Sequence, residues 1–165
     1  MESVYDYYKE LKKIYNFDND YAETAIWGHD IFREKDDDFF ISQAEKYGIE
    51  ISYIEKKSPL LLHGKIAAEY LKEKYSVNSE IYEAVYYHTS GYKFDNDTGK
   101  IMLICDALER TRDFEGVEYL REKSFKGINI AYKLIVKNKI EYALKKQLFI
   151  LPETVEAYNN YISKI

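Results

Sequence analysis

Three histidines and two aspartates are the residues of this sequence whose types and positions suggest chemistry. His29 and Asp30 are adjacent in an otherwise apolar stretch, Trp27-Gly28-His29-Asp30-Ile31-Phe32. An unpartnered carboxylate is costly to bury, and metal coordination would provide the partner, because imidazole and carboxylate groups suit iron, manganese and zinc. Three further residues share this apolar setting: His63, His88 and Asp106.

Each of these residues also has a structural alternative. A single histidine on an apolar helix face is more often a core residue with a satisfied hydrogen bond, and Asp106 could form an internal salt bridge with an arginine. Together the five favour a metal site, because helical folds build two-metal centres from histidines and carboxylates on separate helices. The sequence contains no cysteine-rich zinc pattern and no glycine-rich phosphate loop of the usual type.

Composition limits the class of protein. With 165 residues, 46% of them hydrophobic, the chain suits one globular domain over residues 1–165. The net charge of -5 disfavours a broad nucleic-acid surface, although it leaves room for a local basic phosphate pocket. The single Cys105 cannot form an internal disulfide. With no visible signal peptide or membrane-length apolar run, we expect a cytoplasmic protein with no membrane or nucleic-acid partner.

Apolar periodicity predicts helices throughout, and therefore an all-α helical bundle. Ser3 and Ser79 are expected to cap their helices, Gly48 to end one, and residues 16–19 to form a turn. His29 and Asp30 would lie inside the second helix, and Asp106 in the most apolar one. The expected helices span 3–15, 20–30, 39–47, 52–56, 60–75, 79–88, 99–110, 117–125, 128–148 and 153–162.

The order of short motifs resembles the YqeK branch of the HD-domain superfamily. The resemblance extends from about Leu11 to Tyr161. Two of its segments, Tyr-His-Thr and Arg-Asp-Phe-x-Gly-Val, are specific to that branch. The motifs are His29-Asp30, Leu61-Leu62-His63-Gly64, Tyr87-His88-Thr89-Ser90-Gly91, Cys105-Asp106 and Arg112-Asp113-Phe114-Glu115-Gly116-Val117.

This resemblance implies an HD-domain phosphohydrolase that cleaves diadenosine tetraphosphate symmetrically into two ADP. It also implies two divalent or mixed-valence metal ions, with iron as the expected element, and a homodimer. Two other functions remain open: hydrolysis of another nucleoside phosphate, and a degenerate nucleotide-binding module without catalysis.

The resemblance also assigns roles to residues. His29, Asp30 and Asp106 would bind the first metal, and Asp30 would bridge to a second metal held by His63 and His88. Arg33, where the family usually has lysine, would act with Asp30 in catalysis and grip phosphate as a fork. Thr89 and Arg112 would also contact the substrate, although Arg112 could instead form a salt bridge with Asp113 or a neighbour.

One feature of the family pattern has no counterpart in this sequence. The family has a further histidine ligand on its first helix, and the corresponding position falls at or just before Met1. Residues 1–10 contain no histidine. We therefore expect either a shortened form or a degenerate member, with a weakened first metal site.

Overall fold

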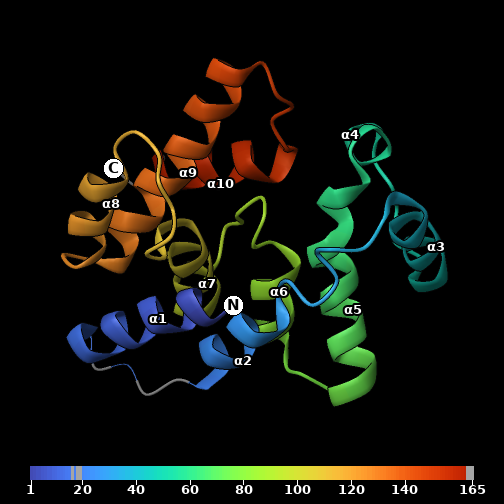
Figure 1. The fold of residues 1–165 in the computed structure, drawn as a ribbon, viewed down its shortest axis with the longest axis horizontal. Helices are drawn as coiled ribbons and strands as arrows, with labels where there is room; N and C mark the ends of the chain where they lie inside the picture. The colour runs from blue at the N-terminus through green and yellow to red at the C-terminus, as the bar shows by residue number, and fades with distance from the viewer. Residues whose placement is uncertain (16, 18–19, 163–165) are drawn as a thin grey trace.

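The computed structural model describes residues 1–15, 17 and 20–162, and it confirms the all-α prediction (Figure 1). Position 17 is the only described part of the turn expected over residues 16–19. No helix in the described ranges is long and apolar enough to cross a membrane. The helices are α1 (Glu2–Tyr15), α2 (Asp20–Gly28), α3 (Asp37–Tyr47), α4 (Tyr53–Lys57), the short 3-10 helix η1 (Pro59–Leu62), α5 (His63–Tyr75), α6 (Ser79–Tyr86), α7 (Asp97–Leu108), α8 (Val117–Ser124), α9 (Ile128–Lys146) and α10 (Pro152–Ile162).

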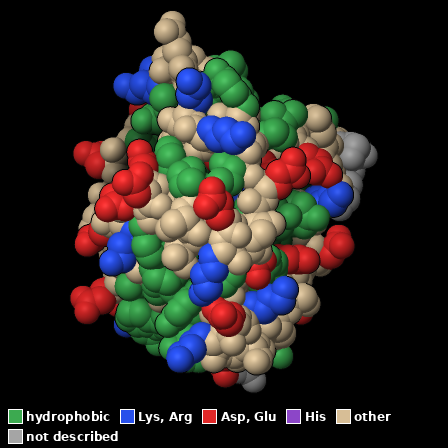
Figure 2. Space-filling model, turned by 90° about the vertical axis from the view of Figure 1, so that its right-hand side faces the viewer, with side chains coloured by type: hydrophobic (Ala, Val, Ile, Leu, Met, Phe, Trp, Pro, Cys, Tyr) green, Lys and Arg blue, Asp and Glu red, His purple; other side chains and the backbone are tan. Residues whose placement is uncertain are grey.

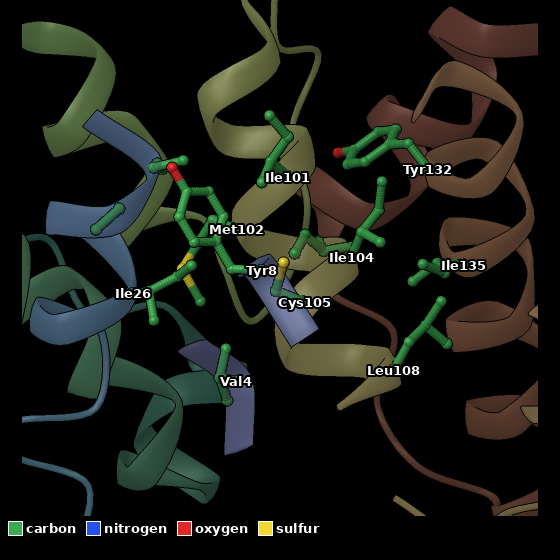
Figure 3. Packing of buried hydrophobic residues seen from close by; sticks show 14 of the residues in the cluster. Val4, Tyr8, Ile26, Ile101, Met102, Ile104, Cys105, Leu108, Tyr132 and Ile135 are labelled. Atoms are coloured by element: carbon green, nitrogen blue, oxygen red, sulfur yellow. The ribbon is translucent and has the colours of Figure 1, made fainter. Parts of the chain in front are cut away.

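Helix α7 forms the centre of the core. Nine of its twelve residues are buried, as expected for a helix that is apolar on nearly every side. Its Met102 and Cys105 point toward α1 and α2, whereas Ile104 and Leu108 point toward α9 (Figure 3). Because α7 is packed on both sides, the backbone that carries Asp106 is held rigidly.

A smaller apolar cluster fixes the start of α5. Phe40 and Ala44 of α3 pack with Leu62 and Ile66, which flank His63 in sequence. On the face of the molecule that Figure 2 shows, acidic, basic and apolar side chains are interspersed and no histidine is visible among the coloured residues. All three imidazoles are buried.

Several helix starts differ from the predictions. Helix α3 begins at Asp37, two residues early, because Asp36 caps it. Helix α1 begins at Glu2, so Ser3 lies within it. Asn78, not Ser79, caps α6 by accepting a hydrogen bond from the backbone N–H of Ile81. Helix α7 begins at Asp97, two residues early, because Asn96 caps it. Apolar periodicity cannot locate such caps, since they depend on one polar side chain reaching the first turn.

The helix ends differ in a way that matters for the site. Helix α2 ends at Gly28, so His29 and Asp30 lie in the turn that follows and not inside the helix as predicted. Helix α6 ends at Tyr86, two residues before His88. His63 is the first residue of α5, directly after η1. All three histidines therefore lie at helix boundaries, where backbone carbonyls are available as hydrogen-bond acceptors.

A buried ion pair joins α4 to α5. The Glu55 carboxylate lies 2.6 Å from Lys65 Nζ and also accepts hydrogen bonds from the backbone N–H and hydroxyl of Ser52. Burial raises the pKa of Glu55, but Lys65 and Ser52 lower it more, so the pKa is below its usual value. Ionised Glu55 therefore contributes stability above its unfolded-state pKa, and this is lost as the pH falls through the lower folded-state value.

We predict that Glu55→Ala lowers the free energy of unfolding by about 2–4 kcal/mol at pH 7, because it leaves the largely buried Lys65 ammonium with only the distant Glu153 carboxylate, 3.9 Å away, as a partner. Glu73→Ala is the matched control, since Glu73 is exposed and its ion pair with Lys46 is screened by solvent, so its loss should change the stability far less. Urea denaturation measures both. The Glu55 effect should shrink as the pH falls below 4.5, the ordinary glutamate pKa; equal losses in the two variants would contradict the prediction.

Candidate metal centre

Three histidines from three segments converge on the Asp30 carboxylate, and Asp106 joins the group through His29. The Nε2 atoms of His63 and His88 lie 3.1 and 3.6 Å from Asp30 Oδ1. The Nε2 atom of His29 lies 3.4 Å from Asp30 Oδ2 and 3.8 Å from Asp106 Oδ1. The structure thus brings together all five residues that the sequence analysis singled out, with Asp30 in the middle.

Each imidazole is oriented through its other nitrogen. The three Nδ1 atoms bond to backbone carbonyls three residues earlier, and a carbonyl oxygen can only accept, so each Nδ1 carries the hydrogen. The side of each ring that carries Nε2 then faces Asp30, and a lone pair on Nε2 is the arrangement that metal-binding histidines use. The accepting carbonyls belong to Ile26, Leu60 and Val85, at 2.7, 2.6 and 2.8 Å.

The centre is consequently crowded with acceptors. The Nε2 atoms of His63 and His88 are only 2.9 Å apart, so a proton on one of them or a bound cation offsets the repulsion between their lone pairs. The Nε2 atom of His29 is buried and has no hydrogen-bond partner among the described residues. Donor atoms of His29, Asp30 and His88 all lie within 4.8 Å of one another. These residues therefore fit a bound metal ion.

The protonation states also suit metal ligands. Burial lowers the pKa of His88 to about 4, so this ring is neutral at pH 7. Burial raises the pKa of Asp30, but its contacts with His29, His63 and His88 lower it more, and the net value is well below the usual range. For Asp106, burial likewise raises the pKa and the surrounding positive groups lower it more, to a value below normal.

The predicted substrate contacts surround this centre. Arg33 Nη1 lies 3.3 and 3.4 Å from the Asp30 oxygens, and the Arg33 side chain is 46% exposed. Thr89 Oγ1 lies 3.3 Å from His88 Nε2. Arg112 donates to the Asp106 carboxylate at 2.7 Å and also pairs with Glu109. The ion pair foreseen as an alternative for Arg112 thus exists with these carboxylates.

The sequence analysis missed one cationic residue near the centre. Lys139 of α9 donates from Nζ to the backbone carbonyl of Thr89 at 2.9 Å. Burial lowers its pKa, whereas the charge of Asp106 raises it. A signal was available, because Lys139 follows Ala131 and Ile135 at steps of four residues and so shares their inward-facing stripe.

Gly64 lets His88 approach α5. A Cβ atom at Gly64 would lie 2.8 Å from the His88 ring and 2.9 Å from the Val85 carbonyl oxygen, the same oxygen that orients His88. Both distances are far below ordinary contact. The adjacency of His63 and Gly64 in one motif therefore has a physical reason. His63 supplies one donor atom, and Gly64 leaves room for the His88 ring, which supplies another.

Proteins of known description are similar to this chain in sequence. No family model matches the chain. A symmetrical bis(5'-nucleosyl)-tetraphosphatase of Halalkalibacterium halodurans is 30% identical over 156 residues, which cover 93% of this chain and 82% of that protein. The protein of the same description from Bacillus subtilis is 29% identical over 157 residues, covering 93% and 83%.

A solved structure has the same fold over nearly the whole chain. It is a Clostridium acetobutylicum protein described as a predicted HD superfamily hydrolase involved in NAD metabolism, and its TM-score is 0.89 at 28% sequence identity. The likeness covers 99% of this chain and 87% of that one.

We predict that Gly64→Ala weakens metal binding about 10- to 100-fold, the usual effect of disturbing the groups that orient a ligand, because the added methyl group displaces the His88 ring. Gly127→Ala is the control: its Cβ would meet only the flexible Ile130 side chain, at 3.3 Å. Calorimetric titration with Mn²⁺ measures both affinities. Unchanged affinity in a folded Gly64→Ala protein would show that His88 does not need its position against α5.

Proposed function

The chain belongs to the family of symmetrical bis(5'-nucleosyl)-tetraphosphatases, within the HD superfamily, and on this premise we propose that it hydrolyses diadenosine tetraphosphate to two ADP. It is a phosphohydrolase; the substrate and the roles of individual residues are the proposal. The observation that carries it is the cluster of imidazole and carboxylate atoms around Asp30, because a bound cation would have several donor atoms there.

Two metal ions would share the cluster. His29, Asp30 and Asp106 would hold the first, and Asp30, His63 and His88 the second, with iron as the expected element. Bound there, the ions supply Lewis acidity, which stabilises charge on phosphoryl oxygens and activates water near neutral pH.

The cationic side chains of the protein would bind the phosphates. Arg33 is half exposed and held only by long contacts to Asp30, so its guanidinium is free to turn and grip a phosphate with paired donors. Arg112 and Lys139 lie on the Asp106 side, and Thr89 adds a hydroxyl beside His88. These groups would fix the tetraphosphate chain and stabilise the charge that develops on it during reaction.

The proposed reaction is a simple hydrolysis. A water oxygen bonds to one of the two central phosphorus atoms, and the bond from that phosphorus to the central bridging oxygen breaks. The electron pair stays on the bridging oxygen, which becomes a terminal oxygen of the departing ADP, and the protons of the water pass to solvent. Cys105 takes no part, because it is fully buried and burial raises its pKa.

The test is product analysis with a substrate panel. We predict that metal-loaded protein converts diadenosine tetraphosphate to ADP alone, that a chelator abolishes turnover, and that a divalent transition ion restores it. The panel should include ATP, deoxynucleotides and NAD, the last because the solved neighbour is described as involved in NAD metabolism. Preferential hydrolysis of one of these compounds would make it the substrate in place of diadenosine tetraphosphate. Binding without any turnover would indicate a non-catalytic nucleotide-binding module.

The same assay tests Arg33. Arg33→Ala should lower kcat/KM about 10- to 100-fold, the loss expected for charge-assisted hydrogen bonds to phosphate, while metal content stays unchanged because guanidinium is not a ligand. Arg110→Ala is the matched control, since Arg110 is 49% exposed and pairs with Glu10. Equal rates for the two variants would make Arg33 a surface residue without a role in catalysis.

A homodimer also remains a proposal, which light scattering can test.

A further inference from the structure

A cleft of about 870 Å³ opens beside the metal centre. It runs between the segment 112–115 and α9, and Asp106, Arg112 and Lys139 line its inner end. Lys145 lies six residues further along α9, or about 9 Å at the helical rise per residue. Its Nζ bonds to the Glu115 carboxylate at 2.9 Å, which ties the two walls together at the outer end.

The inner end of the cleft is suited to phosphate. The ammonium of Lys139 has three donors, and the bond to the Thr89 carbonyl uses one of them. Arg112 presents a guanidinium that is 39% exposed beside the Asp106 carboxylate. Two cationic side chains thus border the cleft directly next to the proposed first metal, where the phosphate chain would leave the centre.

The outer part of the cleft is suited to a nucleoside. Ile135 and Leu120 form a buried apolar floor, and Phe114 and Tyr142 also line it. Tyr142 is 51% exposed and lies almost one turn beyond Lys139 on α9, so its ring is available for a base to stack on. The backbone positions of Lys139 and Tyr142 differ by a helical rise of about 4.5 Å, so the two side chains are neighbours on α9 and one bound nucleotide can reach both.

Asp106 fixes the direction in which a nucleotide would lie. It lines the cleft, and its Oδ1 atom also lies 3.8 Å from His29 Nε2 in the candidate metal centre, and its partner Arg112 brings a cation to the same end. Carboxylates accept hydrogen bonds from ribose hydroxyls in nucleotide sites, and the charged lining residues other than these two and Lys139 are three carboxylates and two ammonium groups, Asp113, Glu115, Glu141, Lys145 and Lys146. Phosphates therefore belong at the Asp106 end and the sugar and base near Tyr142.

From this order of groups we propose that the cleft is the subsite for one nucleoside diphosphate half of the substrate. Lys139 and Arg112 hold its two phosphates, and Tyr142 and Phe114 hold its base. Because the base is held at a fixed distance from the metals, it determines which phosphorus atom of the chain reaches them. The second phosphorus from the nucleoside is then attacked, and its bond to the central bridging oxygen is cleaved. This inference rests on the proposed function, to which it adds a determinant of symmetrical cleavage.

The experiment compares the binding of ADP with the binding of pyrophosphate, and it identifies the nucleotides released from diadenosine tetraphosphate. Metal-loaded Tyr142→Ala should bind ADP about 5- to 100-fold more weakly in calorimetry, the range expected from loss of one stacking contact, and bind pyrophosphate as the unaltered protein does. Lys139→Gln should weaken both ligands. With diadenosine tetraphosphate, Tyr142→Ala should release AMP and ATP beside ADP, because the anchor that fixes the cut is gone.

Tyr75→Ala is the matched control, because Tyr75 is an exposed tyrosine on α5 outside the cleft. Unaltered ADP affinity and ADP-only products in folded Tyr142→Ala would overturn the proposal, as would an equal loss of pyrophosphate binding in that variant. If the unaltered protein cleaves the tetraphosphate to ADP and the variant behaves identically, this inference alone fails. If the unaltered protein neither cleaves the tetraphosphate nor binds ADP, the proposed function fails with it.

Discussion

The candidate centre depends on hydrogen bonds from three imidazole Nδ1 atoms to backbone carbonyls. Carbonyls in the last turn of a helix lack intrahelical partners, and a histidine three residues on can donate to one of them. Ile26 and Val85 supply such carbonyls at the ends of α2 and α6, and Leu60 supplies one within η1. Each bond satisfies the backbone and, at the same time, leaves the opposite nitrogen without a hydrogen. Three Nε2 atoms consequently lie near Asp30, where a bound cation would take up their lone pairs.

The surrounding packing keeps this arrangement rigid on one side and open on the other. Helix α7 is buried between α1, α2 and α9, so Asp106 cannot move away from His29 (Figure 3). The absence of a side chain at Gly64 lets the His88 ring lie against α5. The cationic side chains, by contrast, are partly exposed at the rim, where a phosphate can displace their present contacts. The donor atoms are therefore preorganised, while the groups proposed to bind substrate remain adjustable.

Sequence reasoning found the helices and the five converging residues because both leave strong signals. Apolar periodicity marks a helix whatever its neighbours are, and an acidic or imidazole side chain in an apolar stretch is conspicuous. The caps Asn78 and Asn96 were missed, because a cap depends on one local bond that competing polar residues nearby could equally form. Lys139 was missed because its nearness to Asp106 arises from the packing of α9 on α7, and no short motif records a contact between such distant positions. The need for a glycine at position 64 could not be predicted, because it depends on the His88 ring lying against that residue in the folded chain.

The most direct test of this account is the hydrogen position on each histidine ring. Long-range proton–nitrogen spectra of protein labelled with ¹⁵N-histidine, recorded after chelator treatment and again after addition of Zn²⁺, report the state of both ring nitrogens. We expect all three rings to carry the hydrogen on Nδ1, and zinc to shift the Nε2 resonances while the Nδ1 hydrogens remain. A ring protonated on Nε2 alone, or Nε2 resonances that zinc leaves unmoved, would contradict the claim that backbone carbonyls prepare these histidines to bind metal.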